Sequence, residues 1–291
     1  MDPGARRRVH GHHLYTARAA DHYPRPVPRS PLRKRISTAT ARFARRATLR
    51  RSVRLLGAFR FEQSDPDRFY RPLARDSAEM IEDLHRGATG TGLGGCTVLD
   101  VGGGPGYFAD AFRVAGARYV PVEPDPSEMH AREIDLTGVA IRGSGTALPI
   151  RDGAVDVCFS SNVAEHVAEP WRMADEMLRV TRPGGIVVLS YTLWWGPFGG
   201  HETGRWHYLL GGEGAARRYR RIHGHEPKNR FGTSLFAVHC RDGIAWARSA
   251  PSGELLAAFP RYHPRWAWWL VRVPMVREVL VSNLVLVLRK A

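Results

Sequence analysis

Short apolar runs alternate with amphipathic segments through the central part of the chain. The apolar runs occupy residues 97–101, 119–122, 155–160 and 186–193, and the amphipathic segments occupy residues 107–115, 126–132 and 171–180. Strands that alternate with helices pack as a parallel sheet connected by right-handed crossovers. The pattern therefore predicts an α/β fold in which helices cover both faces of a sheet.

The flanking segments follow other patterns. Residues 37–61 and 76–86 show helical spacing, and residues 87–95 form a Gly/Thr-rich loop. Segment 194–232 breaks the alternation with Gly, His, Trp and Arg, so we expect an insertion there. Beyond the insertion, residues 238–247 suit a strand or a short helix, residues 261–278 an aromatic-rich helical region, and residues 283–288 a final strand.

The net charge of +15 is concentrated at one end of the chain. Residues 1–54 contain 15 basic and 2 acidic side chains, whereas residues 55–291 contain 28 basic and 26 acidic ones. We interpret residues 1–36, which are rich in Arg, His and Pro, as a disordered basic tail. Residues 37–90 are expected to form a helical lid, and residues 91–291 the main domain. The charge therefore supports a nucleic-acid partner only for the N-terminal end of the chain.

Cysteine usage and hydropathy narrow the class of protein further. The three cysteines show no C-x-x-C spacing, which fits neither a disulfide framework nor a zinc site, and we expect no metal. The charge-free run at 183–200 is interrupted by glycines and prolines, and a membrane span needs about 20 apolar residues. The simplest setting is the cytoplasm, without a transmembrane segment.

A glycine-rich turn carries the sharpest chemical signal. The segment Val98-Leu-Asp-Val-Gly-Gly-Gly-Pro-Gly-Tyr107 leads from a buried strand into a helix. Glycines let the backbone approach a ligand, and the helix start offers free N–H groups. The dinucleotide fingerprint does not fit, since its third glycine would fall on Tyr107, and the chain has no G-x-x-x-x-G-K-[ST] phosphate loop. Asp100 at the strand end suits a ligand with a cationic group.

The turn at 100–106, with Glu123 after the next strand, resembles motifs I and II of class I S-adenosylmethionine (SAM)-dependent methyltransferases. Three more likenesses follow in order, at 143–156, at 160–167 and at 178–186, where Arg-Pro-Gly-Gly precedes a strand. Residues 44–288 also resemble an uncharacterised actinobacterial methyltransferase group. The resemblance implies a Rossmann-like, seven-stranded, mostly parallel sheet.

The resemblance also implies SAM as the cofactor and supplies a candidate binding set. In the family, the carboxylate at the position of Glu123 takes both ribose hydroxyls, and such charge-assisted bonds contribute on the order of 1.5–3 kcal/mol. Ser144 replaces the acid that ordinarily accepts the adenine amino group. The candidate cofactor residues are Asp100, Gly102, Gly103, Gly104, Gly106, Glu123, Pro124, Ser144, Gly145, Thr146, Ser161 and Asn162.

Methyl transfer to an alcohol needs a base, and two histidines are placed for that role. His166 follows the fourth predicted strand, and His201 stands in the predicted substrate-binding insertion. The Ser160-Ser-Asn-Val segment lacks the Asn/Asp-Pro-Pro-Tyr pattern of enzymes that methylate adenine or glutamine nitrogens. We therefore expect a small-molecule or lipid acceptor, methylated at oxygen.

Other readings of the sequence stay open. The tryptophans of the insertion and of the C-terminal region suit core packing or an apolar substrate surface, and with the basic helix at 40–60 they allow peripheral membrane contact. One alternative function is an RNA methyltransferase that uses the basic N-terminus. Another is a SAM-fold module that binds a partner without catalysis.

Overall fold

The computed structural model describes residues 32–61, 64–125 and 140–291, with side chains from Thr38 on. The strands are β1 (Thr97–Val101), β2 (Arg118–Glu123), β3 (Ile141–Arg142), β4 (Val155–Ser161), β5 (Thr181–Thr192), β6 (Gly253–Pro260) and β7 (Asn283–Lys290). The α-helices are α1 (Leu32–Arg46), α2 (Leu49–Ala58), α3 (Pro66–Thr89), α4 (Ala109–Val114), α6 (Pro170–Val180), α7 (Trp206–His223), α8 (Cys240–Ser249) and α9 (Val276–Leu280). The 3-10 helices are η1 (Phe59–Phe61), η2 (Ala164–His166), η3 (His201–Thr203) and η4 (Arg265–Arg272).

The sheet has seven strands in the order β3-β2-β1-β4-β5-β7-β6. The five neighbouring strands β3, β2, β1, β4 and β5 run parallel, while β7 runs antiparallel between β5 and β6. The connections after β1 and after β4 leave in opposite directions along the sheet. Ligands of open α/β sheets bind beside such a switch point, at the carboxyl ends of the strands. The predicted Rossmann-like, seven-stranded, mostly parallel sheet is confirmed.

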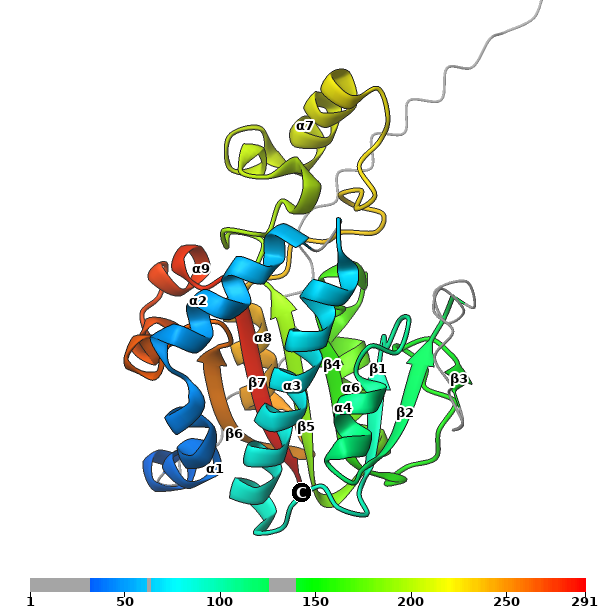
Figure 1. The fold of residues 1–291 in the computed structure, drawn as a ribbon, viewed down its shortest axis with the longest axis vertical. Helices are drawn as coiled ribbons and strands as arrows, with labels where there is room; N and C mark the ends of the chain where they lie inside the picture. Colours follow the sequence, from blue (N-terminus) through cyan, green and yellow to red (C-terminus); the bar gives the residue numbers. More distant parts are fainter. Residues whose placement is uncertain (1–31, 62–63, 126–139) are drawn as a thin grey trace, which may run out of the picture.

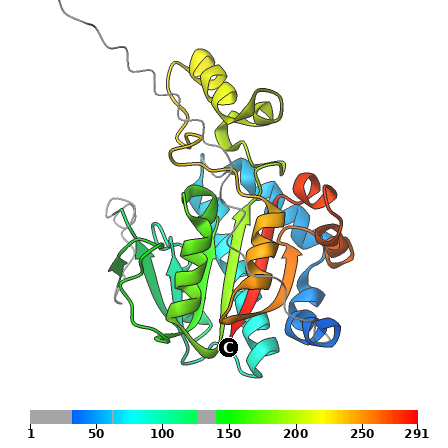
Figure 2. The ribbon, with the colours of Figure 1, turned by 180° about the vertical axis from the view of Figure 1, so that it is seen from behind.

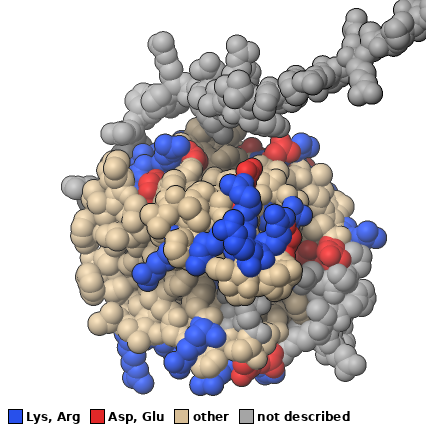
Figure 3. Space-filling model, turned by 90° about the horizontal axis from the view of Figure 1, so that it is seen from above, with Lys and Arg blue, Asp and Glu red and all other residues tan. Residues whose placement is uncertain are grey.

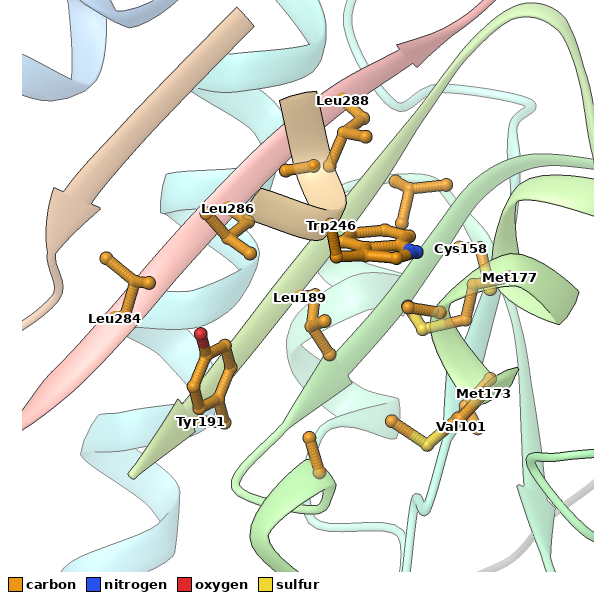
Figure 4. Packing of buried hydrophobic residues seen from close by; sticks show 14 of the residues in the cluster. Val101, Cys158, Met173, Met177, Leu189, Tyr191, Trp246, Leu284, Leu286 and Leu288 are labelled. Carbon is orange, nitrogen blue, oxygen red and sulfur yellow. The ribbon is translucent and has the colours of Figure 1, made fainter. Parts of the chain in front are cut away.

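Helices cover both faces of this sheet, as Figure 1 and its reverse view in Figure 2 show. Helices α1, α3 and α4 pack on one face, where Phe43, Leu84 and Phe112 belong to a single buried cluster. Helices α6 and α8 pack on the other face. There Trp246 lies among Met177 of α6 and the leucines of β7 (Figure 4), and its indole N–H donates to Asp175 at 2.8 Å.

A buried ionic network joins the N-terminal helices to the sheet. Arg51 of α2 forms a bidentate pair with Asp76 of α3, at 2.6 and 2.7 Å, and donates to the Arg261 carbonyl at 2.9 Å. The Arg261 side chain, fully buried after β6, donates to Ser161 at 2.7 Å and to Ser190 at 2.8 Å. Helices α2 and α3 are thus tied to the strand ends by polar contacts as well as by packing.

The insertion between β5 and β6 contributes an outlying helix. Helix α7 lies beyond the carboxyl end of the sheet (Figure 1) and breaks at Gly211, where φ is 66°. Lys and Arg side chains gather on the face seen from that end (Figure 3). Trp206 stacks under Arg218, whose guanidinium lies 3.8 Å from the ring centroid, while Leu209 and Ile222 are exposed.

Several predicted boundaries were wrong at the N-terminal end. Helix α1 begins at Leu32, inside the predicted tail, and residues 1–31 lie outside the described part. The segment 37–61 holds two helices because the Thr48 side chain caps α2 by accepting from the Arg51 N–H. Helix α3 starts ten residues before the predicted 76, where Asp65 caps it and Pro66 opens it.

Differences also occur further along the chain. The helix expected at 126–132 lies outside the described residues. His166 stands in the short 3-10 helix η2, and of the two alternatives for residues 238–247 the structure has the short helix, α8, over Cys240–Ser249. The region 261–278 is mostly the 3-10 helix η4 followed by α9. Strand β6 was not predicted, because its apolar run is short and ends at Pro260.

Candidate functional site

The glycine-rich turn lies where β1 ends, against the end of β2. The Gly102 N–H donates to the Val122 carbonyl at 2.8 Å, and the Gly104 N–H donates to Oε2 of Glu123 at 3.1 Å. Gly102, Gly104 and Gly106 all have positive φ, a conformation that glycine adopts without steric cost. A Cβ on Gly103 would lie 2.8 Å from that of Pro121, so the turn packs closely on β2.

Asp100 is an unusual buried acid beneath this turn. It is 2% exposed, and its Oδ2 accepts a hydrogen bond from the Tyr119 hydroxyl at 2.6 Å. Burial raises the pKa of Asp100 to about 7; the Tyr119 hydrogen bond opposes the shift, and the nearby charge of Glu123 adds to it. The ionised form of this carboxyl is thus poorly solvated, and a cationic ligand would stabilise it.

The remaining cofactor candidates line the same edge of the sheet. The Gly143 N–H donates to the Glu123 carbonyl at 3.2 Å, so the loop that carries Ser144, Gly145 and Thr146 follows directly beside Glu123 and Pro124. The Ser144 and Thr146 hydroxyls bond each other at 2.9 Å in an exposed position. A Cβ on Gly145 would meet the side chains of β1 and α6.

Two candidates after β4 are engaged inside the protein. Ser161 accepts from Arg261, and the Oδ1 of Asn162 accepts from the Asn283 amide at 2.7 Å. Asn162 has a φ of 57°, and its N–H donates to the Ser190 carbonyl at 2.8 Å. Their side chains fix the backbone at this switch point, so cofactor contacts from them remain a prediction.

His166 and His201 are brought together, although 35 positions separate them in the sequence. Their rings are 5.1 Å apart and nearly perpendicular, at 71°. The Nδ1–H of His166 donates to the Ser234 carbonyl at 2.7 Å, which leaves Nε2 with the lone pair. Burial lowers the pKa of His201 to about 4, so its imidazole is neutral near pH 7. Val163, close before His166, lies against Gly102.

A buried acid completes a cluster that the sequence did not predict. Glu165 is 1% exposed; its Oε1 accepts the Thr192 N–H at 3.0 Å, and its Oε2 is buried without a hydrogen-bond partner. The Nε2 of His201 is also buried and unpartnered. One ligand atom each from Glu165, His166 and His201 lie within 4.8 Å of one another.

The tryptophans divide into two groups. Trp194 is buried, and the ring of Trp268 stacks on that of Phe259 with centroids 4.5 Å apart, so these two tryptophans have the packing role. Trp266 and Trp269 of η4 are 70% and 52% exposed.

Sequence reasoning missed the network around Arg261, since a buried arginine has no signature in local periodicity.

Comparison with known proteins finds a family model for the central part of the chain. The family model described as "Methyltransferase domain" matches residues 99–189, which span the turn, the Glu123 edge and the His166 segment. Among solved structures, an S-adenosylmethionine-dependent methyltransferase from Mesorhizobium loti has a TM-score of 0.47 and 17% identity, covering 68% of this chain and 92% of that one.

Relatives match over nearly their whole length. An "Uncharacterized methyltransferase" of Mycolicibacterium gilvum is 67% identical over 254 residues, 86% of this chain and 98% of the relative. One from Mycobacteroides abscessus is 63% identical over 253 residues, 85% of this chain and 96% of the relative. The chain belongs to this mycobacterial family of class I methyltransferases, whose cofactor is S-adenosylmethionine.

Proposed function

We propose that the protein transfers a methyl group from SAM to an oxygen atom of an apolar small-molecule or lipid acceptor. The observation that carries the proposal is the His166–His201 pair beyond the end of β4, next to the segment that packs on the glycine turn. Two imidazoles at this place supply what an alcohol acceptor needs, a group that takes its proton.

The residues around the turn fit the cofactor. Asp100 is a poorly compensated buried carboxyl, which suits the positive charges of SAM, and Glu123 offers a carboxylate for the ribose hydroxyls. A Cβ on Gly104 would meet nothing within 4 Å, so the turn has an open face. When bound, SAM supplies a methyl group already activated on sulfur, and the chain orients the acceptor and excludes water.

We assign the base role to one of the two histidines. The Ser234 carbonyl fixes the tautomer of His166 and leaves its Nε2 to accept a proton. Burial keeps the neighbouring His201 imidazole neutral near pH 7. The expected order is deprotonation of the acceptor hydroxyl during attack, with the proton leaving on imidazole.

A surface on α2 and η4 favours a lipid acceptor or a membrane-bound one. Leu49, Val53, Trp266 and Trp269 are 52–70% exposed, and both elements also contain arginines. The Arg265 N–H donates to the carbonyl of Ala47, the residue two before α2, so the two elements are neighbours (Figure 2). Aromatic residues beside arginines suit the interface of an anionic bilayer. The described residues include no helix that is long and apolar enough to cross a membrane.

Radiolabelled SAM and a mycobacterial lipid extract test the activity. We expect a labelled product that is stable to mild acid. His166→Asn or His201→Asn should lower the amount of label incorporated at least tenfold, while calorimetry shows unchanged SAM binding. Full turnover by both variants contradicts the base assignment. Label confined to RNA, added in a parallel reaction, contradicts the acceptor class.

The membrane contact has a separate test. In sedimentation with phosphatidylglycerol vesicles, the wild type should pellet with the vesicles and a Trp266→Ser/Trp269→Ser variant should stay in the supernatant. A Trp206→Ser variant, altered on α7 instead, serves as the matched control. Equal binding by all three proteins contradicts the role of the α2–η4 surface.

A further inference from the structure

We propose that Glu165, His166 and His201 form a binding site for a divalent transition-metal ion of the zinc type. Their ligand atoms lie within 4.8 Å of one another, at the carboxyl end of β4 and in the insertion. For its chemical purpose the inference rests on the proposed methyl transfer to oxygen. An ion held by both histidines would occupy the nitrogens assigned as the base. It would act in their place by lowering the pKa of a coordinated acceptor hydroxyl, whose proton then passes to water. Metal binding itself does not depend on methyl transfer.

The strongest observation is a pair of unsatisfied atoms on two residues of the cluster. Oε2 of Glu165 and Nε2 of His201 are buried and have no hydrogen-bond partner. A buried polar atom without a partner is destabilising, so such atoms call for a water or an ion. Here they are a carboxyl oxygen and an imidazole nitrogen, both metal-ligand types, on residues that bring ligand atoms within 4.8 Å of one another.

Each of two ligands is oriented by a second contact, as metal ligands usually are. The Ser234 carbonyl holds His166 through Nδ1, and the Thr192 N–H holds Glu165 through Oε1. In each case the remaining atom is the one available for an ion. The hydrogen bond that His166 donates raises the basicity of its other ring nitrogen, and both contacts fix the direction of the ligand side chains.

The donor set selects the kind of ion. Two imidazoles and one carboxylate with an open position are the ligands of catalytic zinc sites and suit other first-row divalent ions, whereas Mg²⁺ and Ca²⁺ prefer oxygen ligands. His166 is only half-buried, so the site has a side open to the acceptor. Ligands about 2.1 Å from a tetrahedral ion stand about 3.4 Å apart, so binding requires the ligand atoms, now within 4.8 Å of one another, to close by up to about 1.4 Å.

The backbone around His201 is built for a defined placement of its ring. His201 has a φ of 46°, a left-handed conformation that is uncommon for residues other than glycine, and it follows Gly199 and Gly200. Strain of this kind is retained where surrounding structure imposes it, often at binding sites. The insertion thus delivers one imidazole onto a pair of ligands supplied by η2.

The test uses the full chain, free of any tag, stripped with a chelator and titrated with Co²⁺ in the absence of SAM. We expect one equivalent to bind with the visible absorption of low-coordinate Co²⁺, and Zn²⁺ to displace it. Glu165→Gln, which keeps the acceptor for Thr192, and His201→Asn, which tolerates a left-handed backbone, should each weaken binding more than about tenfold. His225→Ala, which removes an exposed histidine outside the cluster, should change nothing.

Wild-type protein that takes up no more Co²⁺ than the Glu165→Gln variant overturns the proposal, as does equal weakening by His225→Ala. His166→Asn keeps a donor for the Ser234 carbonyl and gives a third variant if either of the others fails to fold. SAM binding, measured by calorimetry on the same samples, separates the two ideas. A chain that binds Co²⁺ and SAM but labels no acceptor refutes the proposed function and leaves the metal site standing.

Discussion

The ion pair between Arg51 and Asp76 gives the sharpest test of how the N-terminal helices are held. Both side chains are buried, 6% and 4% exposed, and two hydrogen bonds of 2.6 and 2.7 Å join them. Arg51→Met removes the partner and leaves a buried carboxylate. Breaking a buried pair in this way costs about 3–5 kcal/mol. For a domain of this size, that loss lowers the melting temperature by roughly 6–20 °C.

Urea unfolding, followed by tryptophan fluorescence, measures the loss. A double variant, Arg51→Met with Asp76→Leu, should recover most of it, because apolar replacement of a whole buried pair is close to neutral. Arg71→Met is the matched control. It breaks an exposed pair with Asp67, 3.1 Å apart, and should cost less than about 1 kcal/mol. A single variant as stable as the control, or a double variant with the summed loss, would refute the reasoning.

Three further predictions concern the glycine turn and its acids. Because burial raises the pKa of Asp100 to about 7 from an ordinary 3.8, ionisation should lower the unfolding free energy by up to roughly 4 kcal/mol as pH rises from about 4 to 7. Asp100→Asn should remove that slope in urea titrations at several pH values; parallel curves for the two proteins contradict it. Gly103→Ala places a Cβ 2.8 Å from that of Pro121 and should weaken SAM binding at least tenfold by calorimetry, and an unchanged Kd argues against this turn as the cofactor site. Glu123→Gln should raise the Kd of SAM about 10- to 100-fold through loss of charge-assisted bonds, and a smaller change places the ribose elsewhere.

The central strands and the turn were predictable because their signals are local. An apolar run that ends in glycines identifies β1 and the turn after it, and the structure keeps the predicted strand bounds there. Glu123 could be placed beside the turn because parallel strands share a carboxyl edge. The place of these parts follows from the local pattern, whereas the cofactor role expected of them comes from the resemblance to a known family.

Features that depend on distant partners escaped prediction. Strand β6 is defined by its pairing with β7, since its own sequence has Gly253, Glu254 and Pro260 at its ends. The Arg261 network joins β4, β5 and α3, and no local pattern anticipates a fully buried arginine. Glu165 precedes His166 in the sequence, and only the fold brings a ligand atom of His201 within 4.8 Å of one of its own.

The place of β7 in the sheet sets a demand on folding kinetics. Strand β5 ends at Thr192, yet the strand that covers its open edge begins at Asn283, so residues 193–282 must be accommodated first. Pairing over so long a sequence separation is slow, because loop-closure entropy is lost before the contacts form. Until then β5 presents unpaired N–H and C=O groups on an apolar strand. We expect refolding to have a slow, concentration-sensitive phase in which this edge is the point of self-association.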